Sequence, residues 1–352
     1  MLIIAIDPGS TSTKIGILQN NEIIKETFNH ERSLIDSFET IYEQKDFRLK
    51  AIKDFLQKKL SKTEKVEAVV GRGGLTKPIK GGVYRVNEEM LKDLKIGVMG
   101  QHAANLGGIM AKEIARIYGC EAFITNPPVI DEMSEIAKVT GFKGTTRKSM
   151  FHALNQKSVA LKVSQKIGKK YDEINLIVAH LGGGISIGIH QKGNVTDVNN
   201  ALDGDGPFSP ERAGSIPVDE VIKLIRKGLY TADELKNIVS RKAGLYSYLG
   251  TTDLKDVEKR IEDGDGEAKL YYEAMAYQIS KEIGALSTVV NGNVDAIILT
   301  GGLAFSEKFV KLINERVSFI GKIFIEPGEN EIEALIEAGL RVTTGQERYL
   351  EY

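Results

Sequence analysis

The sequence has one cysteine, almost no net charge and no long apolar run, and each absence excludes a class of protein. Cys120 stands alone among 352 residues, which rules out an internal disulfide framework, and no Cys/His spacing typical of a structural zinc site is present. Forty-seven basic and forty-eight acidic residues leave a formal charge of -1, which does not support a general nucleic-acid binding surface. No segment approaches the ~18 apolar residues of a membrane span, and no basic, apolar leader opens the chain. We therefore expect a cytoplasmic protein with no nucleic-acid or membrane partner.

Two common nucleotide-binding signatures are also missing. Residues 144–149 read GTTRKS and end in Lys-Ser, but they lack the glycines of a P-loop. No GxGxxG follows a strand, which argues against dinucleotide binding of the Rossmann type. The chain is long enough for about two domains, and 42% hydrophobic residues can form a substantial core.

What the sequence does contain is a polar turn between two apolar runs near its start. Strand-like Leu2–Ile6 leads into DPGSTSTK at Asp7–Lys14, the strand pattern resumes at Ile15–Leu18, and Ile23–Glu26 predicts a third, antiparallel strand. A carboxylate, several hydroxyls and an ammonium in one tight turn suit the binding of a polyphosphate and its metal.

Each polar residue of this turn has a plausible task in such a site. We expect Asp7 to bind or orient Mg²⁺ through water, Ser10 and Ser12 to donate to phosphate oxygens, and Lys14 to add a positive charge. The alternative is an ordinary hairpin turn in which the hydroxyls satisfy nearby backbone groups.

The same pattern recurs in the middle of the chain. Residues 176–198 read LIVAHLGGGISIGIHQKGNVTDV, and with a one-residue gap His180 falls opposite Asp7 and Gly188 opposite Gly16. Repetition at this distance indicates a duplicated domain. In a further segment, Ala296–Ala304, a buried-looking strand runs into the pair Gly301-Gly302 ahead of a helical segment, an arrangement that favours nucleotide binding.

Duplicated strand-turn-strand units followed by a glycine pair resemble the actin-like ATPase superfamily. The resemblance implies an α/β fold with two duplicated actin-like (ribonuclease H-like) domains and a cleft between them. We expect the first domain at residues 1–148 and the second, nucleotide-binding domain at 149–332. A C-terminal helix at about 333–352 is expected to pack back on the first domain.

Several short motifs narrow the resemblance. The first loop, AHLGGG at residues 179–184, Phe151-His152, the Arg72 turn, Asp131, and Arg212 in SPERAGSIP together resemble the acetokinase family. Within it, the chain looks most like butyrate and branched-chain fatty acid kinases. The resemblance implies reversible, direct in-line transfer of the ATP γ-phosphoryl group to a short-chain carboxylate, which yields acyl phosphate and ADP. It also implies Mg²⁺ as cofactor, ATP as co-substrate, and a homodimer or higher homo-oligomer.

The resemblance assigns roles to particular residues. Arg72 and Arg212 would clamp the carboxylate and the phosphoryl group, His152 would contact the phosphoryl group in flight, and Asp131 would position the arginine or the metal. Without the resemblance, Asp131 reads as a helix cap. The other implied sites are ATP and phosphate binding by His180, Gly182, Gly183, Gly184, Gly301 and Gly302, an acyl pocket at Gly73, Gly74 and Phe151, and a metal ligand at Glu331 beside Asp7, with Glu329 as the alternative.

Two departures from acetate kinases bear on the substrate. Gly73-Gly74 stands where acetate kinases carry valines, which would leave room for a longer acyl tail, and two extra buried methylenes are worth about 1.6 kcal/mol, or roughly fifteenfold. Gln156 replaces the second histidine of their FHxTSH pattern. Two alternatives stay open: an acetate or propionate kinase, and a non-catalytic, nucleotide-gated actin-like protein, which would have no need of a carboxylate clamp.

Overall fold

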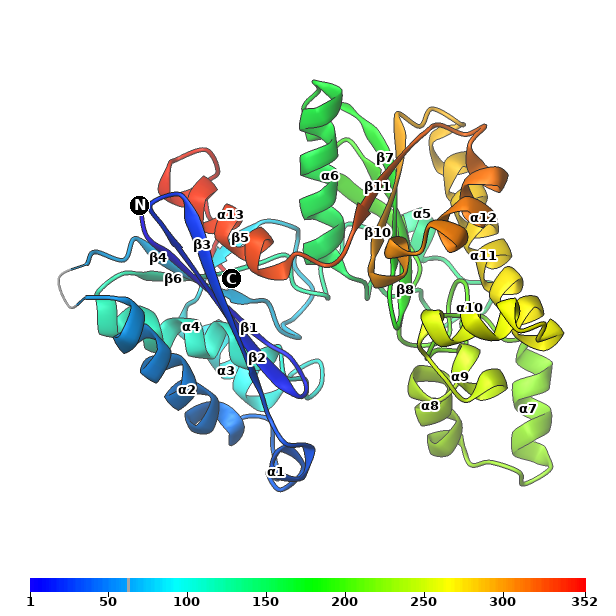
Figure 1. Ribbon diagram of the computed structural model, residues 1–352, viewed down its shortest axis with the longest axis horizontal. Coiled ribbons are helices and arrows are strands. Elements are labelled where there is room, and N and C mark those ends of the chain that lie inside the picture. The colour runs from blue at the N-terminus through cyan, green and yellow to red at the C-terminus, as the bar shows by residue number, and fades with distance from the viewer. Residues whose placement is uncertain (62–63) are drawn as a thin grey trace. The chain divides into compact units, whose positions relative to one another are not determined.

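The computed structural model describes residues 1–61 and 64–352, which form two compact units. The first unit comprises residues 1–131 and 330–352, and the second comprises 132–329. None of the described helices is both long and apolar enough to cross a membrane. In the first unit the elements are β1 (Ile3–Pro8), β2 (Ser12–Gln19), β3 (Glu22–Asn29), α1 (Arg32–Asp36), α2 (Gln44–Lys59), β4 (Ala68–Arg72), β5 (Val83–Arg85), α3 (Glu88–Ile96), α4 (Asn105–Tyr118), β6 (Glu121–Thr125) and α13 (Glu331–Thr343) (Figure 1).

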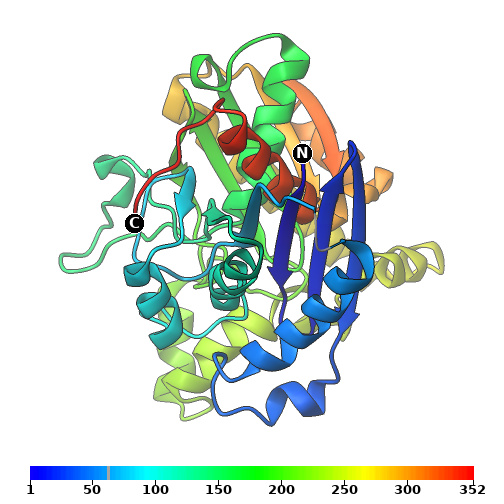
Figure 2. The same ribbon diagram turned by 90° about the vertical axis from the view of Figure 1, so that its left-hand side faces the viewer.

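The first unit is built on a six-stranded sheet in the order β3-β2-β1-β4-β6-β5. The three N-terminal strands are antiparallel neighbours, as predicted, and they lie side by side in Figure 2. Strands β1, β4 and β6 run parallel, so their carboxyl ends meet at one edge of the sheet. Asp7 and Arg72 therefore come from neighbouring strand ends.

Helices α4 and α13 cover opposite faces of this sheet. A side chain at Gly71 would collide with the backbone of Gly107 in α4, whereas the space beside Gly339 of α13 is filled by Ile3 and Val70. Because neighbouring residues of a strand point to opposite faces, Val70 and Gly71 place the two helices on either side.

The second unit repeats the plan of the first. Its elements are α5 (Glu135–Lys138), α6 (Ala153–Ile167), the 3₁₀ helix η1 (Tyr171–Glu173), β7 (Asn175–Leu181), β8 (Ile185–Gln191), β9 (Asn194–Val198), α7 (Val218–Arg226), α8 (Ala232–Arg241), α9 (Gly244–Leu249), α10 (Leu254–Glu262), α11 (Gly266–Ser287), η2 (Thr288–Val290), β10 (Ala296–Gly301), η3 (Gly302–Phe305), α12 (Glu307–Val317) and β11 (Lys322–Pro327) (Figure 1). The five strands follow the order β11-β10-β7-β8-β9. Strands β9, β8, β7, β10 and β11 therefore correspond in order to β3, β2, β1, β4 and β6 of the first sheet, and β5 has no counterpart among the described strands of the second.

Alternate residues of β7 build two separate cores. Ile177, Ala179 and Leu181 pack with apolar side chains of α11 and α12. Leu176 and Val178 pack with α6. The strand is buried on both faces, which explains why its sequence is a continuous apolar run.

Strand register confirms the internal repeat. In the first unit Ala5 pairs with Gly16 and Asp7 with Lys14, while in the second Val178 pairs with Gly188 and His180 with Ser186. Asp7 and His180 therefore occupy equivalent positions, two residues beyond the residue that faces the glycine. The duplication predicted from the sequence holds at the level of single residue pairs.

The division between the units differs from the one expected from the sequence. Residues 132–148 belong with the second unit because Ser134 donates its backbone N–H to Thr196, and Arg147 pairs with Asp197. The C-terminal helix is also shorter than expected and ends at Thr343. After it Gly345 adopts φ +75°, and the tail returns to β5, where Leu350 exchanges backbone hydrogen bonds with Val83 and Arg85.

A fully buried arginine holds the turn between β1 and β2. The Arg48 guanidinium, at 0% exposure, donates to the carbonyl oxygens of Gly9, Ser10 and Ser12 at 2.8 to 3.2 Å and to the hydroxyl of Thr13. Its remaining contact is the side-chain oxygen of Gln44, one helical turn earlier. Burial lowers the pKa of Arg48 to about 10, so it stays charged at neutral pH.

We predict that Arg48→Met destabilises the first unit. The carbonyls of Gly9 and Ser10 would lose their Arg48 donor, and a buried polar group left unsatisfied costs about 1–3 kcal/mol. The free energy of unfolding, measured by urea denaturation, should fall by about 2 kcal/mol or more. Arg32→Met, a change at an exposed arginine, should lie within about 0.5 kcal/mol of wild type. Equal effects of the two changes would contradict the role given to Arg48.

Candidate active site

Arg72 is held at the end of β4 by two buried carboxylates. Its Nη1 lies 3.0 Å from Asp7 Oδ1 and 2.5 Å from Glu331 Oε1. Lys14 reaches the same group, 2.9 Å from Glu331 and 3.7 Å from Asp7. The structure thus brings together four residues that the sequence analysis had assigned separately to catalysis, phosphate and metal.

The two carboxylates of this cluster differ in their affinity for a proton. Burial raises the pKa of Asp7, and the neighbouring Glu331 raises it further, although Arg72 and Lys14 act in the opposite direction. Burial would also raise the pKa of Glu331, but Arg72, the hydrogen bond with Asp7 and Lys14 outweigh it and lower that pKa. The two carboxylates therefore titrate as a coupled pair.

The loop after Asp7 presents its hydroxyls outward. Ser10 is exposed and Ser12 half-buried, and neither hydroxyl has a protein partner among the described residues. Their backbone carbonyls, by contrast, are bound by Arg48. The hydroxyls are thus available to a ligand while the loop itself is fixed, as phosphate binding requires.

Gly73 and Gly74 have a packing reason to be glycine. A Cβ at Gly73 would lie 2.7 Å from the Pro127 ring, and one at Gly74 would lie 2.5 Å from the Cα of Asn105. The space that a side chain would fill is thus already occupied by neighbouring backbone. An acyl pocket at these glycines stays a prediction, and their lack of side chains does not by itself support it.

Asp131 follows β6 in the first unit, and its backbone N–H donates to Ile79 at 2.8 Å. The interpretation of this residue as a helix cap is wrong, because α5 begins only at Glu135 and its N-cap is Ser134. A catalytic role for Asp131 stays a prediction.

The predicted residues of the second unit gather around the turn between β7 and β8. The rings of His152, at the start of α6, and His180, at the end of β7, stack with centroids 3.8 Å apart and an angle of 10°. Phe151, which precedes His152 in the sequence, is buried. Nδ1 of His180 lies 2.8 Å from the side-chain oxygen of Asn155.

Arg212 lies against the glycine loop at residues 182–184. A Cβ at Gly184 would come within 2.0 Å of its Nη1, so only glycine allows the guanidinium to lie there. Nη1 donates to the carbonyl of Ala201 at 2.7 Å, but the buried Nε has no partner and no carboxylate pairs with Arg212 among the described residues. Burial, the largest influence, lowers the pKa of Arg212. A guanidinium whose buried Nε has no hydrogen-bond partner is suited to receive an anion.

The glycine pair after β10 lies next to the same loop. Gly301 adopts φ +87°, and a Cβ there would meet the carbonyl of Leu181 at 2.4 Å. Gly302 is exposed and opens η3, with the longer α12 capped by Ser306 immediately after it. The predicted sequence of strand, glycine pair and helix is confirmed.

The donor set near Asp7 fits a magnesium ion. No group of three or more His, Cys, Asp or Glu residues suited to a metal occurs in the described part of the chain. Magnesium needs no such group, because one or two carboxylates suffice when phosphate oxygens and waters complete its shell. Glu331 is the glutamate beside Asp7, whereas Glu329 belongs to the second unit and lies 3.8 Å from Nε2 of His180.

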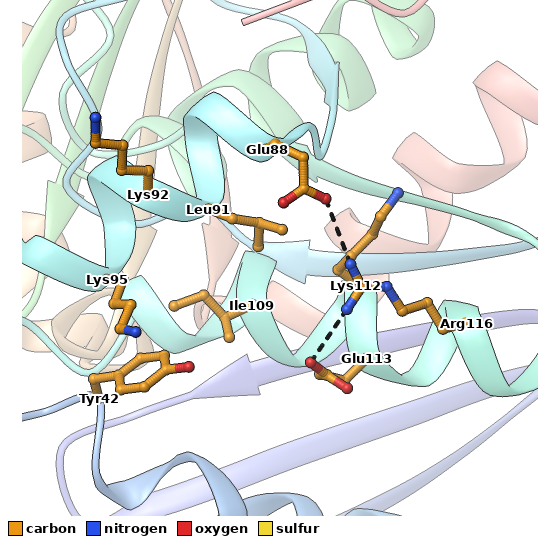
Figure 3. A pocket seen from close by; sticks show the side chains of 9 residues that line it. All are labelled: Tyr42, Glu88, Leu91, Lys92, Lys95, Ile109, Lys112, Glu113 and Arg116. Atoms are coloured by element: carbon orange, nitrogen blue, oxygen red, sulfur yellow. Dashed lines mark hydrogen bonds and ion pairs between the residues drawn. The ribbon is translucent and has the colours of Figure 1, made fainter.

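A separate hollow of about 330 Å³ lies on the outside of α3 and α4 (Figure 3). In it Lys95 lies over the Tyr42 ring at 4.6 Å, and Arg116 pairs with Glu88 and Glu113. None of the predicted site residues lines it. We therefore do not assign the hollow to the active site.

The sequence analysis missed three residues that shape the site: Arg48, Asn155 and Ser186. Asn155 donates to the carbonyls of Gly328 and Glu329 while its oxygen faces His180. Ser186 lies opposite His180 in the register and contacts His152. The only sequence feature that could have identified Asn155 and Ser186 was their closeness to a motif. Asn155 follows the Phe-His motif, and Ser186 follows the glycine loop.

Solved structures of similar fold include kinases of short carboxylic acids. An acetate kinase from Porphyromonas gingivalis superposes with a TM-score of 0.77 at 18% identity, covering 96% of this chain and 98% of the other. A propionate kinase from Francisella tularensis gives 0.74 at 19% identity over the same shares. These likenesses confirm the predicted α/β fold with two duplicated domains.

Sequence comparison extends the likeness to the family. The model of the acetokinase family matches residues 134–344. Butyrate kinase 2 from Clostridium acetobutylicum is 48% identical over 351 residues, which cover 99% of this chain and 99% of that protein. The predicted kinase class is confirmed: the chain belongs to the acetokinase family.

Proposed function

We propose that this chain is a butyrate kinase, which transfers the γ-phosphoryl group of ATP reversibly to butyrate or a branched-chain analogue. A carboxylate oxygen attacks the γ-phosphorus, the bond from that phosphorus to the bridging oxygen breaks, and acyl phosphate and ADP result. The structural observation that carries the proposal is Arg212, whose buried Nε has no hydrogen-bond partner and whose guanidinium forms no ion pair within the described residues. The near-identical length and 48% identity of a butyrate kinase support the choice of acid.

The roles of the residues follow from the charges in this reaction. Two anions must approach each other, so cations and hydrogen-bond donors are the groups that lower the barrier. We assign Arg212 and His152 to the phosphoryl group, Arg72 to the carboxylate, and Ser10, Ser12, Lys14 and the glycine loop to the phosphates of ATP. When bound, Mg²⁺ would neutralise phosphate charge, and Asp7 with Glu331 would hold it.

We also propose a cytoplasmic, homo-oligomeric enzyme. ATP is an intracellular co-substrate, which supports the location. Ile136, Val139 and Phe142 expose 72% to 84% of their surfaces on one short segment, and exposed apolar clusters of this kind mark interaction sites. Light scattering in solution gives the number of subunits and tests the assembly.

We predict that the purified protein forms hydroxamate from ATP and butyrate. Acetate, propionate, butyrate and isobutyrate should be compared in parallel. Butyrate should exceed acetate in kcat/KM by about fifteenfold, since two buried methylenes contribute about 1.6 kcal/mol. A lack of acyl phosphate with every acid would contradict the kinase assignment, and a preference for acetate would instead identify an acetate kinase.

We predict that Arg72→Lys lowers kcat by about 10³-fold, the lower end of what an arginine contributes in phosphoryl transfer. The lysine keeps the charge that Asp7 and Glu331 require but loses the planar fork that binds two oxygens. Arg85→Lys is the matched control, because Arg85 belongs to the same unit and pairs with Glu351. A kcat of Arg72→Lys within threefold of wild type would remove Arg72 from the catalytic residues.

We predict that EDTA abolishes activity and that Mg²⁺ restores it. In Asp7→Asn, the Mg²⁺ concentration for half-maximal activity should rise by about tenfold or more, the scale on which changes near a metal lower its affinity. Asp93→Asn is the control, since Asp93 is also buried but pairs with Lys77. An unchanged magnesium requirement in Asp7→Asn would argue against Asp7 as a ligand.

A further inference from the structure

A chain of buried polar side chains lies behind His152 in the second unit. Tyr171 contacts Nδ1 of His190 at 2.7 Å, and Nε2 of His190 lies 3.0 Å from the Gln156 oxygen. The Gln156 nitrogen lies 2.9 Å from the Ser186 hydroxyl, which is 2.8 Å from Nδ1 of His152. Gln156, Ser186 and His190 are all 0% exposed, so their polar groups must find their hydrogen-bond partners among these neighbouring side chains and the adjacent backbone.

Gln156 fixes the direction of the hydrogen bonds at its end of the chain. Its nitrogen lies 3.0 Å from the backbone carbonyl of Ser186, and a carbonyl only accepts, so the amide can have only one orientation. The Gln156 oxygen must then accept from Nε2 of His190, which leaves Nδ1 of His190 to accept from Tyr171. Burial lowers the pKa of His190 well below its usual value and raises that of Tyr171, which keeps both groups neutral.

The hydrogen bonds of the Ser186 hydroxyl determine which ring nitrogen of His152 carries the proton. A serine hydroxyl has one donor and two acceptor positions. The Gln156 amide and the backbone N–H of His152, 3.3 Å away, both donate to it. Both acceptor positions of the hydroxyl are then occupied, so the hydroxyl must donate its own proton to Nδ1 of His152. If Nδ1 itself carried a proton, the hydroxyl would have no acceptor for its proton. Neutral His152 therefore carries its proton on Nε2.

His180 is fixed in the opposite way. The Asn155 nitrogen donates to two carbonyls, those of Gly328 and Glu329, so its oxygen faces His180 and accepts from Nδ1. The two stacked imidazoles thus hold their protons on different nitrogens.

We infer that Gln156 is a positioning residue that acts through Ser186 to hold His152 as the Nε2–H tautomer. The kinetic consequence rests on the proposed function, in which this tautomer would make Nε2 of His152 a hydrogen-bond donor to a phosphoryl oxygen. Neither the family match nor the shared fold specifies this tautomer.

The test reads the tautomer directly, without substrate. Long-range ¹H–¹⁵N spectra of the full chain labelled at its five histidines distinguish a protonated ring nitrogen from an unprotonated one, and His152→Gln identifies the signals of His152. Wild type should show the proton of His152 on Nε2 and that of His180 on Nδ1. A proton on Nδ1 of neutral His152 in the wild-type protein would overturn the inference.

Variants then distinguish a role of Gln156 and Ser186 in fixing the His152 tautomer from a role in stabilising the fold alone. Gln156→Met and Ser186→Ala should give mixed tautomers of His152 and a kcat for butyrate about fivefold to tenfold lower, the equivalent of one lost hydrogen bond, with little change in KM for ATP. Tyr171→Phe should leave both the tautomer and kcat unchanged, because the Ser186 carbonyl still orients Gln156. Ser280→Ala, which removes a buried hydroxyl bonded within α11, is the matched control.

Each outcome separates this inference from the proposed function. An unchanged tautomer in folded Gln156→Met and Ser186→Ala would overturn the role of Gln156. A kcat loss in Tyr171→Phe as large as in Gln156→Met would show a merely structural network and overturn it as well. A wild-type protein that has the expected tautomer but phosphorylates no carboxylate would sink the proposed function and leave the tautomer assignment in place.

Discussion

The ion pairs of Arg72 with Asp7 and Glu331 are the interaction on which the first unit depends. They join the ends of β1 and β4 to the start of α13, three segments that are distant in the sequence. Two carboxylates buried side by side repel each other and lose their hydration, so they require compensating positive charge. Arg72 and Lys14 supply the positive charge. The groups best suited to substrate and metal are therefore also the groups that fasten the C-terminal helix to the sheet.

The duplication shows how one backbone plan carries two kinds of chemistry. Equivalent positions of the two units hold the pair Asp7 and Lys14 in one and His180 and Ser186 in the other. The first pair is charged and neighbours further charged groups, whereas the second joins neutral hydrogen-bonded networks. The strand register fixes the position of a side chain in the site. The residue type then decides whether that position forms ion pairs or neutral hydrogen bonds.

The sequence predicted the parts of the fold that depend on local patterns. Alternation of apolar residues and the facing glycines revealed both strand-turn-strand units, because register and close packing act on neighbours in the chain. Arg48 escaped notice because a buried arginine on a helix looks like any solvated one until its carbonyl partners are known. The C-terminal tail was missed because its contact with β5 joins distant segments. The roles of His152, Arg212 and Asp131 stay predictions, since they concern a substrate.

The neutral network behind His152 also constrains how the second unit can meet negative charge. With Tyr171 and His190 both held neutral, nothing in that chain supplies a full positive charge to the imidazole. His152 can then orient an oxygen, but charge-assisted hydrogen bonds are roughly twice as strong as neutral ones. Arg212 is a cation of the same unit: burial lowers its pKa, but from a value so far above neutrality that the group stays charged. Its buried Nε has no hydrogen-bond partner, and a buried donor left unsatisfied costs free energy, which an anion bound at this nitrogen would recover.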